Sequence, residues 1–305
     1  MTNILIIGGS TPLQKLLPQF LNTEKVKIVA VFLNTSEDQS AMQYCKNNSI
    51  EYFASKEICK QLEMLENAEI DWIFNINSTI ILSDDILKIP LNGALNLHPG
   101  LLPFYAGLHT HQWAIRNKEK AFGVTLHWME PGIDTGDIAF QKIFPLIGNE
   151  TGLSLFIKCL NEGVKLVKIA LHYIIEGKEI PSIKQDLSQR RLYTNKMAKD
   201  GLICWNIKYN VLLDFFRAAN YKPFRSPTYE PYSILNGKKF FIEKIQLDNE
   251  SDRLAPGIIE LNKDGKILVG LEDVNIIITP ELSKSDFDNM EDFTAYILNS
   301  SKSLT

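Results

Sequence analysis

Residues 93–107, GALNLHPGLLPFYAG, combine a short apolar strand with an abrupt stop. Side chains alternate between the two faces of a strand, so Asn96 and His98 are expected to share one face. Pro99 has no backbone N–H with which to continue a sheet ladder, so the strand should end there. The stretch therefore predicts an amide and an imidazole that project together where a strand passes into a loop.

The residues before this stretch alternate between strand-like and helix-like segments. Four short apolar runs, separated by segments with polar faces, occur at residues 3–9, 27–34, 50–53 and 71–77. Strands that alternate with helices indicate a doubly wound, mostly parallel sheet. Ligands of such open α/β sheets bind at the carboxyl ends of the strands, which is where Asn96 and His98 are expected.

Two further strands are expected after the stretch, at residues 122–129 and 137–146, followed by one long amphipathic helix at residues 152–177. Together with the preceding strands they predict an α/β first domain at residues 1–187. The next segment, residues 188–205, is polar and lacks periodicity, as a linker would.

The remaining residues, 206–305, have a different pattern. An Asn-Gly pair at 236–237 and an Asp-Gly pair at 264–265 separate apolar runs, which is typical of hairpin turns. One amphipathic helix is expected to close this region with the side chains of Phe287, Met290, Phe293 and Ile297. We therefore predict a second, smaller, mainly β domain.

The composition restricts the class of protein. The formal net charge is −4, whereas a dedicated nucleic-acid binder usually presents a basic face. The chain begins without the basic region and cleavage site of a signal peptide, and no apolar run approaches the ~20 residues of a membrane span. The four cysteines are scattered, without the spacing of a zinc site or a disulfide frame. These features predict a cytoplasmic protein.

Neither a metal site nor a nicotinamide site is predicted from the sequence. Four histidines, His98, His109, His111 and His127, lie close together in the sequence, but no H-E-x-x-H or similar metal-ligand spacing appears, so no metal is predicted. The glycine pair at 8–9 lacks the G-x-G-x-x-G spacing of a nicotinamide site and is interpreted as a tight strand-to-helix turn.

A carboxylate completes the candidate site. Asp134 lies in a loop flanked by Gly132 and Gly136, which would bring it back towards Asn96 and His98. An amide, an imidazole and a carboxylate without a Ser or Cys nucleophile suit the attack of an external amine on a carbonyl. Asn96 would donate a hydrogen bond to the developing oxyanion, His98 would handle protons, and Asp134 would fix or charge the imidazole.

Two motifs carry a resemblance to a known family: NLHPGLLPFYAG at residues 96–107 and GVTLHWMEPGIDTGDI at residues 123–138. They resemble the folate-dependent formyltransferases, which include methionyl-tRNA formyltransferase, glycinamide ribonucleotide formyltransferase and the N-formyltransferases of nucleotide-linked amino sugars. The resemblance covers residues 1 to 180. The second domain resembles the small, OB-like β domain of the tRNA and sugar branches, and DGLICW at residues 200–205 fits the same group.

The resemblance implies roles for particular residues. Asn96, His98 and Asp134 fall on the family's catalytic triad, and the formyl donor of the family is N10-formyltetrahydrofolate. No metal is needed for direct attack of the acceptor amine on the formyl carbon. The pterin of the donor would lie against two backbone segments and one further side chain, at Ile80, Ile81 and Leu82, at Glu130, Pro131, Gly132 and Ile133, and at Leu108. Two positions depart from the family pattern, with Gly100 in place of serine and Phe104 in place of a basic residue.

The acceptor is inferred from the branches of the family. Methionyl-tRNA enzymes carry a basic loop after the second strand, where residues 33–49 of this chain hold only Lys46 as a cation. Acidic residues also outnumber basic ones in the second domain, and phosphate contacts dominate affinity for nucleic acids. GLHTH at residues 107–111 is found in the purine-nucleotide branch, whose enzymes usually lack a second domain. GLH followed by GVTLHWM looks most like the amino-sugar branch.

The resulting expectation is an enzyme that formylates a nucleotide-linked amino sugar, as in lipopolysaccharide O-antigen biosynthesis. Gly107, His109 and Trp113 are candidate acceptor-side residues. We expect a small-molecule partner, no nucleic acid, no membrane, and a homodimer through the second domain. Methionyl-tRNA and purine-type amines remain alternative acceptors. Water as acceptor would make the chain a formyltetrahydrofolate hydrolase, and a non-catalytic binding module would need none of the three triad residues.

Overall fold

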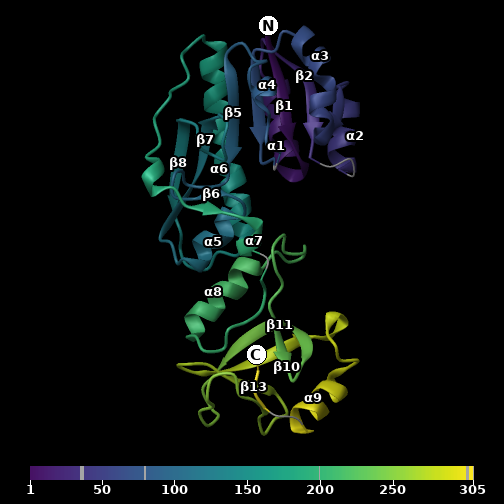
Figure 1. Ribbon diagram of the computed structural model, residues 1–305, viewed down its shortest axis with the longest axis vertical. Coiled ribbons are helices and arrows are strands. Elements are labelled where there is room, and N and C mark those ends of the chain that lie inside the picture. Colours follow the sequence, from purple (N-terminus) through teal and green to yellow (C-terminus); the bar gives the residue numbers. More distant parts are fainter. Residues whose placement is uncertain (35–37, 79, 199, 300–301, 305) are drawn as a thin grey trace. The chain divides into compact units, whose positions relative to one another are not determined.

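The computed structural model describes residues 1–34, 38–78, 80–198, 200–299 and 302–304 (Figure 1). Its residue contacts divide the chain into two compact units. Unit 1 comprises Met1–His111, Lys120–Leu146 and Phe156–Tyr193, and unit 2 comprises Gln112–Glu119, Ile147–Leu155 and Thr194–Thr305. The domain and linker boundaries expected from the sequence stay a prediction.

A seven-stranded sheet forms the centre of unit 1, with the strand order β3-β2-β1-β4-β5-β7-β8. Its strands are β1 (Thr2–Gly8), β2 (Val26–Leu33), β3 (Tyr52–Ala54), β4 (Trp72–Ile76), β5 (Gly93–His98), β7 (Ala121–Trp128) and β8 (Ile138–Pro145). Neighbours from β3 to β5 are parallel, whereas β5 pairs antiparallel with β7, and β7 with β8. The expected mostly parallel sheet is confirmed, and it carries an antiparallel edge.

Helices connect these strands. They are α1 (Ser10–Leu21), α2 (Gln39–Asn47), the 3₁₀ helix η1 (Ser55–Gln61), α3 (Leu62–Asn67), α4 (Asp84–Leu87), α5 (Thr110–Arg116), α6 (Gly152–Ile175) and the 3₁₀ helix η2 (Leu187–Gln189). Two short strands, β6 (Ala106–Gly107) and β9 (Leu192–Tyr193), form a separate parallel ladder. This ladder includes residues that the sequence analysis assigned to a linker.

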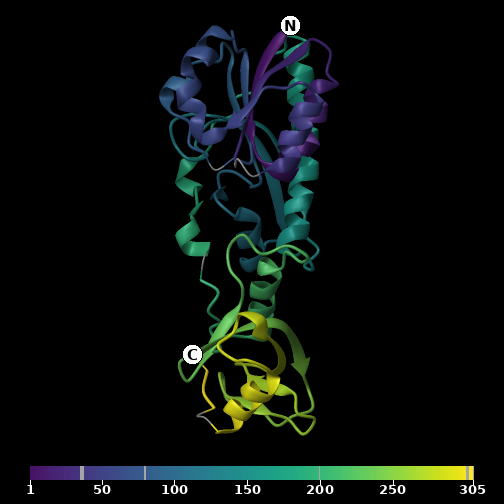
Figure 2. The same ribbon diagram turned by 90° about the vertical axis from the view of Figure 1, so that its right-hand side faces the viewer.

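The alternation of strand side chains separates two apolar layers. Ile4 and Ile6 of β1 lie in the cluster that includes α1 and α6, whereas Leu5 and Ile7 lie in the cluster that includes α3 and α4. Figure 2 shows helices on both sides of the sheet. Each such fully buried side chain contributes about 1.5–3 kcal/mol to the stability of the fold. The central strands are therefore packed on both faces, which fixes the positions of the residues at their carboxyl ends.

Helix α6 has 24 residues and presents an apolar stripe to this sheet. Leu166, Val167, Ala170 and Leu171 of the stripe are buried. The helix ends shortly before Gly177, whose φ of 65° is one that glycine adopts readily. No helix within the described ranges is both long enough and apolar enough to cross a membrane.

Unit 2 contains an antiparallel five-stranded sheet with the order β10-β11-β14-β13-β12. Its strands are β10 (Tyr232–Leu235), β11 (Lys238–Asp248), β12 (Ile259–Leu261), β13 (Ile267–Gly270) and β14 (Asn275–Glu281). Asn236 and Gly237, between β10 and β11, have φ values of 46° and 84°, as a hairpin turn with two left-handed residues requires. The expected fold class, a mostly parallel α/β sheet with a second β-rich region, is confirmed.

The helices of unit 2 are α7 (Asn195–Ala198), α8 (Tyr209–Ala219), the 3₁₀ helix η3 (Leu282–Lys284) and α9 (Met290–Asn299). Phe293 and Ile297 of α9 are buried, as expected from their spacing. Phe287 is also buried but precedes the helix, and Met290 is 45% exposed. The apolar face of α9 is therefore shorter than the sequence predicted, because the chain enters the helix only at Met290.

Candidate active site

Polar side chains share one face of the three neighbouring strands β4, β5 and β7. Asn75 lies opposite Asn96 in the parallel register, and Asn96 and His98 lie opposite His127 and Thr125 in the antiparallel register. These five polar side chains are buried. The residues that alternate with them along the strands point to the other face, where they belong to an apolar cluster. The sheet therefore gathers an amide, an imidazole and further polar groups where the sequence predicted only Asn96 and His98.

Asp134 reaches this face from the loop between β7 and β8. Its backbone adopts a φ of 54°, an uncommon conformation for a residue with a side chain. One carboxylate oxygen lies 3.5 Å from Nδ1 of His98 and accepts the N–H of Gly107 at 2.7 Å. The other lies 3.4 Å from Nδ2 of Asn96 and 3.4 Å from Nε2 of His127. The three residues predicted from the sequence as a triad thus lie within contact distance of one another.

The proton of His98 has a defined place. Its Nε2 lies 2.7 Å from the carbonyl oxygen of Tyr105, which can only accept, so Nε2 carries the hydrogen. Burial lowers the pKa of His98, although Asp134 opposes the shift. In the neutral ring, Nδ1 therefore keeps a free lone pair beside Asp134, and this atom is the one able to take up a proton.

The charge of Asp134 is maintained although the carboxyl is mostly buried. Burial favours its neutral form, but the positive charges that His98 and His127 carry when protonated, together with the N–H of Gly107, hold its pKa well below the usual range. Asp134 is therefore ionised at neutral pH. A carboxylate in this place stabilises an imidazolium at His98 once the ring has been protonated.

The sequence analysis named His127 only among the four histidines considered as metal ligands and predicted no role for it in this site. Its Nδ1 lies 2.7 Å from the carbonyl oxygen of Trp128 and must donate to it, so Nε2 of the neutral ring is an acceptor. Nδ2 of Asn96 donates to that acceptor at 2.9 Å. His127 thereby fixes which end of the Asn96 amide faces the carboxylate. Only the register of β5 with β7 reveals this contact.

Gly100, one of the departures from the family pattern, lies against the same imidazole. A Cβ added at Gly100 would lie 2.3 Å from Nε2 of His98 and 2.5 Å from the carbonyl oxygen of Tyr105. The hydroxyl of Thr125 donates to the carbonyl of Gly100 at 2.7 Å, which holds the loop in this position. The hydrogen bond between His98 and Tyr105 therefore requires glycine at position 100.

Replacing Gly100 with alanine is expected to lower the rate of the reaction carried out at this site. The added methyl would displace His98 or Tyr105, and displacements of about 1 Å in active sites cost about 100-fold in rate. The measurement is kcat together with the unfolding temperature, which separates a displaced imidazole from a collapsed fold. A Gly100→Ala protein with an unchanged kcat would show that the bond between His98 and Tyr105 is dispensable.

The residues expected to face the pterin lie on three segments outside the main strands and helices, and they differ in exposure. Ile80, Ile81 and Leu82 follow β4, with Ile81 75% exposed and Leu82 buried. Residues 130–133 precede Asp134 in the β7–β8 loop and are exposed. Leu108, whose side chain is half-buried, follows β6. Their roles towards a donor stay a prediction.

The site has features that suit a folate donor. Oδ1 of Asn75 is buried without a hydrogen-bond partner among the described residues, and Asn75 lies directly beside Asn96. The adjoining residues 80–82 belong to no helix or strand, and the N–H of Ile80 donates to the hydroxyl of Ser78 at 3.2 Å. The residues present therefore fit a formyl donor such as a folate, whose pterin ring carries hydrogen-bonding groups along its edge.

The expected acceptor-side residues divide between the units. Gly107 and His109 belong to unit 1, with φ values of 90° and 56°, and Gly107 N–H donates to Asp134. Trp113 lies on α5 in unit 2, where the guanidinium of Arg116 stands 4.4 Å from the centre of its ring. Gly107 is thus in contact with the triad through Asp134, and the acceptor roles of all three stay a prediction.

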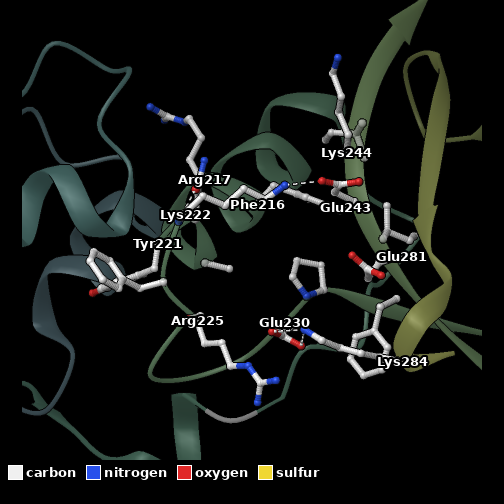
Figure 3. A pocket seen from close by; sticks show the side chains of 18 of the residues that line it. Phe216, Arg217, Tyr221, Lys222, Arg225, Glu230, Glu243, Lys244, Glu281 and Lys284 are labelled. Atoms are coloured by element: carbon white, nitrogen blue, oxygen red, sulfur yellow. Dashed lines mark hydrogen bonds and ion pairs between the residues drawn. The ribbon is translucent and has the colours of Figure 1, made fainter.

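A hollow of about 540 Å³ lies within unit 2 between α8, the chain after it, β11 and the end of β14 (Figure 3). Two ion pairs border it, Lys222 with Glu243 at 2.5 Å and Lys284 with Glu230 at 2.7 Å. None of the predicted site residues lines this hollow. In the part of the chain that the structure describes, no group of three His, Cys, Asp or Glu side chains is placed to hold a metal ion.

Comparisons with known proteins agree on one family. The family model of formyl transferases matches residues 2–171. The bifunctional polymyxin resistance protein ArnA of Wigglesworthia glossinidia brevipalpis is 34% identical over 203 residues, which cover 67% of this chain but only 30% of that protein. The methionyl-tRNA formyltransferase of Agathobacter rectalis is 31% identical over 227 residues, which cover 72% of this chain and 71% of that enzyme.

A solved structure is similar over nearly the whole chain. The N-formyltransferase of Helicobacter canadensis, crystallised with folinic acid and dTDP-3-aminofucose, matches with a TM-score of 0.67 and 25% sequence identity. The match covers 92% of this chain and 100% of that one. The resemblance inferred from residues 96–107 and 123–138 is thus confirmed, and this chain belongs to the formyl transferase family.

Proposed function

We propose that this protein transfers the formyl group of N10-formyltetrahydrofolate to the amine of a nucleotide-linked amino sugar, at the site formed by Asn96, His98 and Asp134. The observation that carries the choice of acceptor is the similarity to the Helicobacter canadensis enzyme, which extends over 92% of this chain and all of that one. That enzyme was crystallised with a folate and a nucleotide-linked amino sugar. A product of this kind would serve as a building block of a lipopolysaccharide O antigen.

The donor supplies an activated formyl carbon, and the residues of the chain supply orientation and proton transfer. Nδ2 of Asn96 gives one hydrogen to His127, while its other hydrogen makes only a long contact of 3.4 Å with Asp134. That second hydrogen can be donated to a formyl oxygen placed beside the amide, where it stabilises negative charge. Asn96 is thus a donor aimed by His127.

His98 provides the base. The hydrogen on its Nε2 is held by Tyr105, so Nδ1 takes the proton that the acceptor nitrogen loses when it bonds to the formyl carbon. Asp134, 3.5 Å from Nδ1, stabilises the imidazolium that results. His98 then returns this proton to the departing nitrogen of the donor, so that no proton is left on the enzyme.

Methionyl-tRNA is the second candidate acceptor. The curated relative from Agathobacter rectalis, matched over 71% of its length, is a methionyl-tRNA formyltransferase. Against it stands the scarcity of cations after β2, where Lys46 is the only one within residues 33–49. Residues 35–37 of that segment lie outside the described residues, and residues 39–47 form α2.

The acceptor can be identified by mass spectrometry. Formyltetrahydrofolate would be incubated with the protein and, separately, with dTDP-linked, UDP-linked and GDP-linked amino sugars, methionyl-tRNA, glycinamide ribonucleotide, or buffer alone. We expect one amino-sugar nucleotide to gain a formyl group in place of one hydrogen. Formylation of methionyl-tRNA alone would overturn the proposed acceptor, and release of formate in buffer alone would identify a hydrolase.

A further inference from the structure

The segment after α6 passes along the candidate active site instead of leaving it. Residues 181–193, here called the strap, continue from α6 beside β8 and then beside β6 (Figure 1). Ile183 forms two backbone hydrogen bonds with Ile138, the first residue of β8, at 2.8 and 3.0 Å. At its other end, strand β9 pairs with β6. Both ends of the strap are thus attached to strands of unit 1.

Between these attachments, the strap bonds the loop that carries Asp134. Nε2 of Gln185 donates to the carbonyl oxygens of Asp134 at 3.1 Å and of Gly136 at 2.6 Å. A side-chain nitrogen of Arg190 donates to the carbonyl oxygen of Ile133 at 2.5 Å. Three backbone carbonyl groups of the loop, at residues 133, 134 and 136, are therefore bonded by two strap side chains.

The strap also supports the other side of Asp134. Leu108 donates its N–H to the carbonyl of Tyr193 at 2.8 Å, which sets the backbone next to Gly107. The ring of Tyr193 stacks on that of Tyr105 at 5.2 Å, and the carbonyl of Tyr105 fixes the proton of His98. The N–H of Gly107, which binds Asp134, and the carbonyl of Tyr105, which binds His98, are thus each adjacent to a strap contact.

We propose that Gln185 is a positioning residue of the formyl transfer, which acts through the backbone of Asp134 to hold its carboxylate beside His98. The inference rests on the proposed function. Asp134 has the left-handed φ of 54°, a conformation that needs support from its surroundings. Both groups that Gln185 faces are carbonyl oxygens, so its amide nitrogen must point to them, and its buried Oε1 has no partner among the described residues. The two donated bonds supply that support.

The test compares Gln185→Leu, Gln185→Glu and the control Gln189→Leu. Leucine is close in size to glutamine but donates no hydrogen bond, whereas Gln189 is an exposed strap residue whose amide donates to Asp186. Gln185→Leu is expected to lower kcat by about 30-fold, as loss of alignment does, with KM for donor and acceptor nearly unchanged. Gln189→Leu should keep the wild-type kcat.

Gln185→Glu gives a readout that a merely structural role would not produce. The ionised glutamate repels the two carbonyl oxygens, but a protonated glutamate can donate to one of them. The ratio of its kcat to that of the wild-type protein should therefore rise as the pH falls. A ratio independent of pH, or an unchanged kcat in Gln185→Leu, would overturn the proposal.

A second measurement is independent of any acceptor. Gly107 N–H is bonded to Asp134, so its hydrogen exchange reports whether the carboxylate is in place. Exchange at Gly107 should be at least about 10-fold faster in Gln185→Leu than in Gln189→Leu, at an unchanged unfolding temperature. If no acceptor in the panel is formylated, the proposed function fails, and this exchange still decides on the positioning role. Equal exchange rates in the two variants would refute it.

Discussion

Replacing His98 with alanine is expected to lower kcat by about 10³-fold, within the range that general acid–base groups contribute. The imidazole is buried at the end of β5, with its Nε2 hydrogen held by the carbonyl of Tyr105 and its Nδ1 directed to Asp134. The measurement is single-turnover formyl transfer at saturating donor and acceptor.

The control for this variant is His172→Ala, which removes an imidazole from the exposed face of α6. It should keep the wild-type rate, and both variants should unfold cooperatively. The wild-type pH profile adds a second check. Because burial lowers the pKa of His98, the neutral base persists as the pH falls to 6.5, the usual imidazole value, and the rate should decline only below it. A rate that already falls above pH 7 would contradict the assignment of His98 as the base.

Replacing Asp134 with asparagine is expected to lower kcat by about 10³-fold as well, because the imidazolium formed at His98 loses its counter-charge. Asparagine keeps an oxygen that can accept the N–H of Gly107, so the loop is expected to stay in place. The variant therefore separates the charge of Asp134 from its part in holding the loop. The measurement is kcat across pH, with circular dichroism to verify the fold.

The pH dependence of this variant has a definite sign. Asp134 raises the pKa of His98 against the lowering effect of burial, so its removal should shift the acid limb of the rate profile to lower pH. Asp288→Asn, an exposed carboxyl just before α9, serves as the control and should change neither rate nor profile. An Asp134→Asn protein with near-normal turnover would remove the carboxylate from the mechanism.

Much of the fold could be predicted from local patterns. Apolar runs located β1, β4 and β5, because strands buried on both faces are rich in apolar residues, and Gly9 and Pro99 marked the ends of β1 and β5. The Asn236–Gly237 turn was predictable because few residues other than asparagine and glycine accept its two positive φ values. The start of α9 was not predictable, because Phe287 continues the helical spacing although it lies before the helix.

The candidate site was predictable only where neighbours in sequence share a face. Asn96 and His98 are two residues apart on one strand, so period-two alternation brings them together. His127 joins them through the pairing of β5 with β7, which no local pattern specifies. Gln185 lies 51 residues from Asp134 in a polar stretch without periodicity, and its contact depends on how the chain returns after α6. Long-range contacts of this kind leave no signal in a single sequence.

The most direct measurement follows the formyl carbon itself. A donor carrying ¹³C in the formyl group would be mixed with the wild-type protein and its amino-sugar nucleotide, and the label would be located by NMR after one turnover. We predict that the label appears as a formamide on the sugar nitrogen, and that it remains on the donor with His98→Ala or Asp134→Asn. Label recovered as formate, or transferred at the wild-type rate by either variant, would contradict amine attack at the Asn96, His98 and Asp134 site.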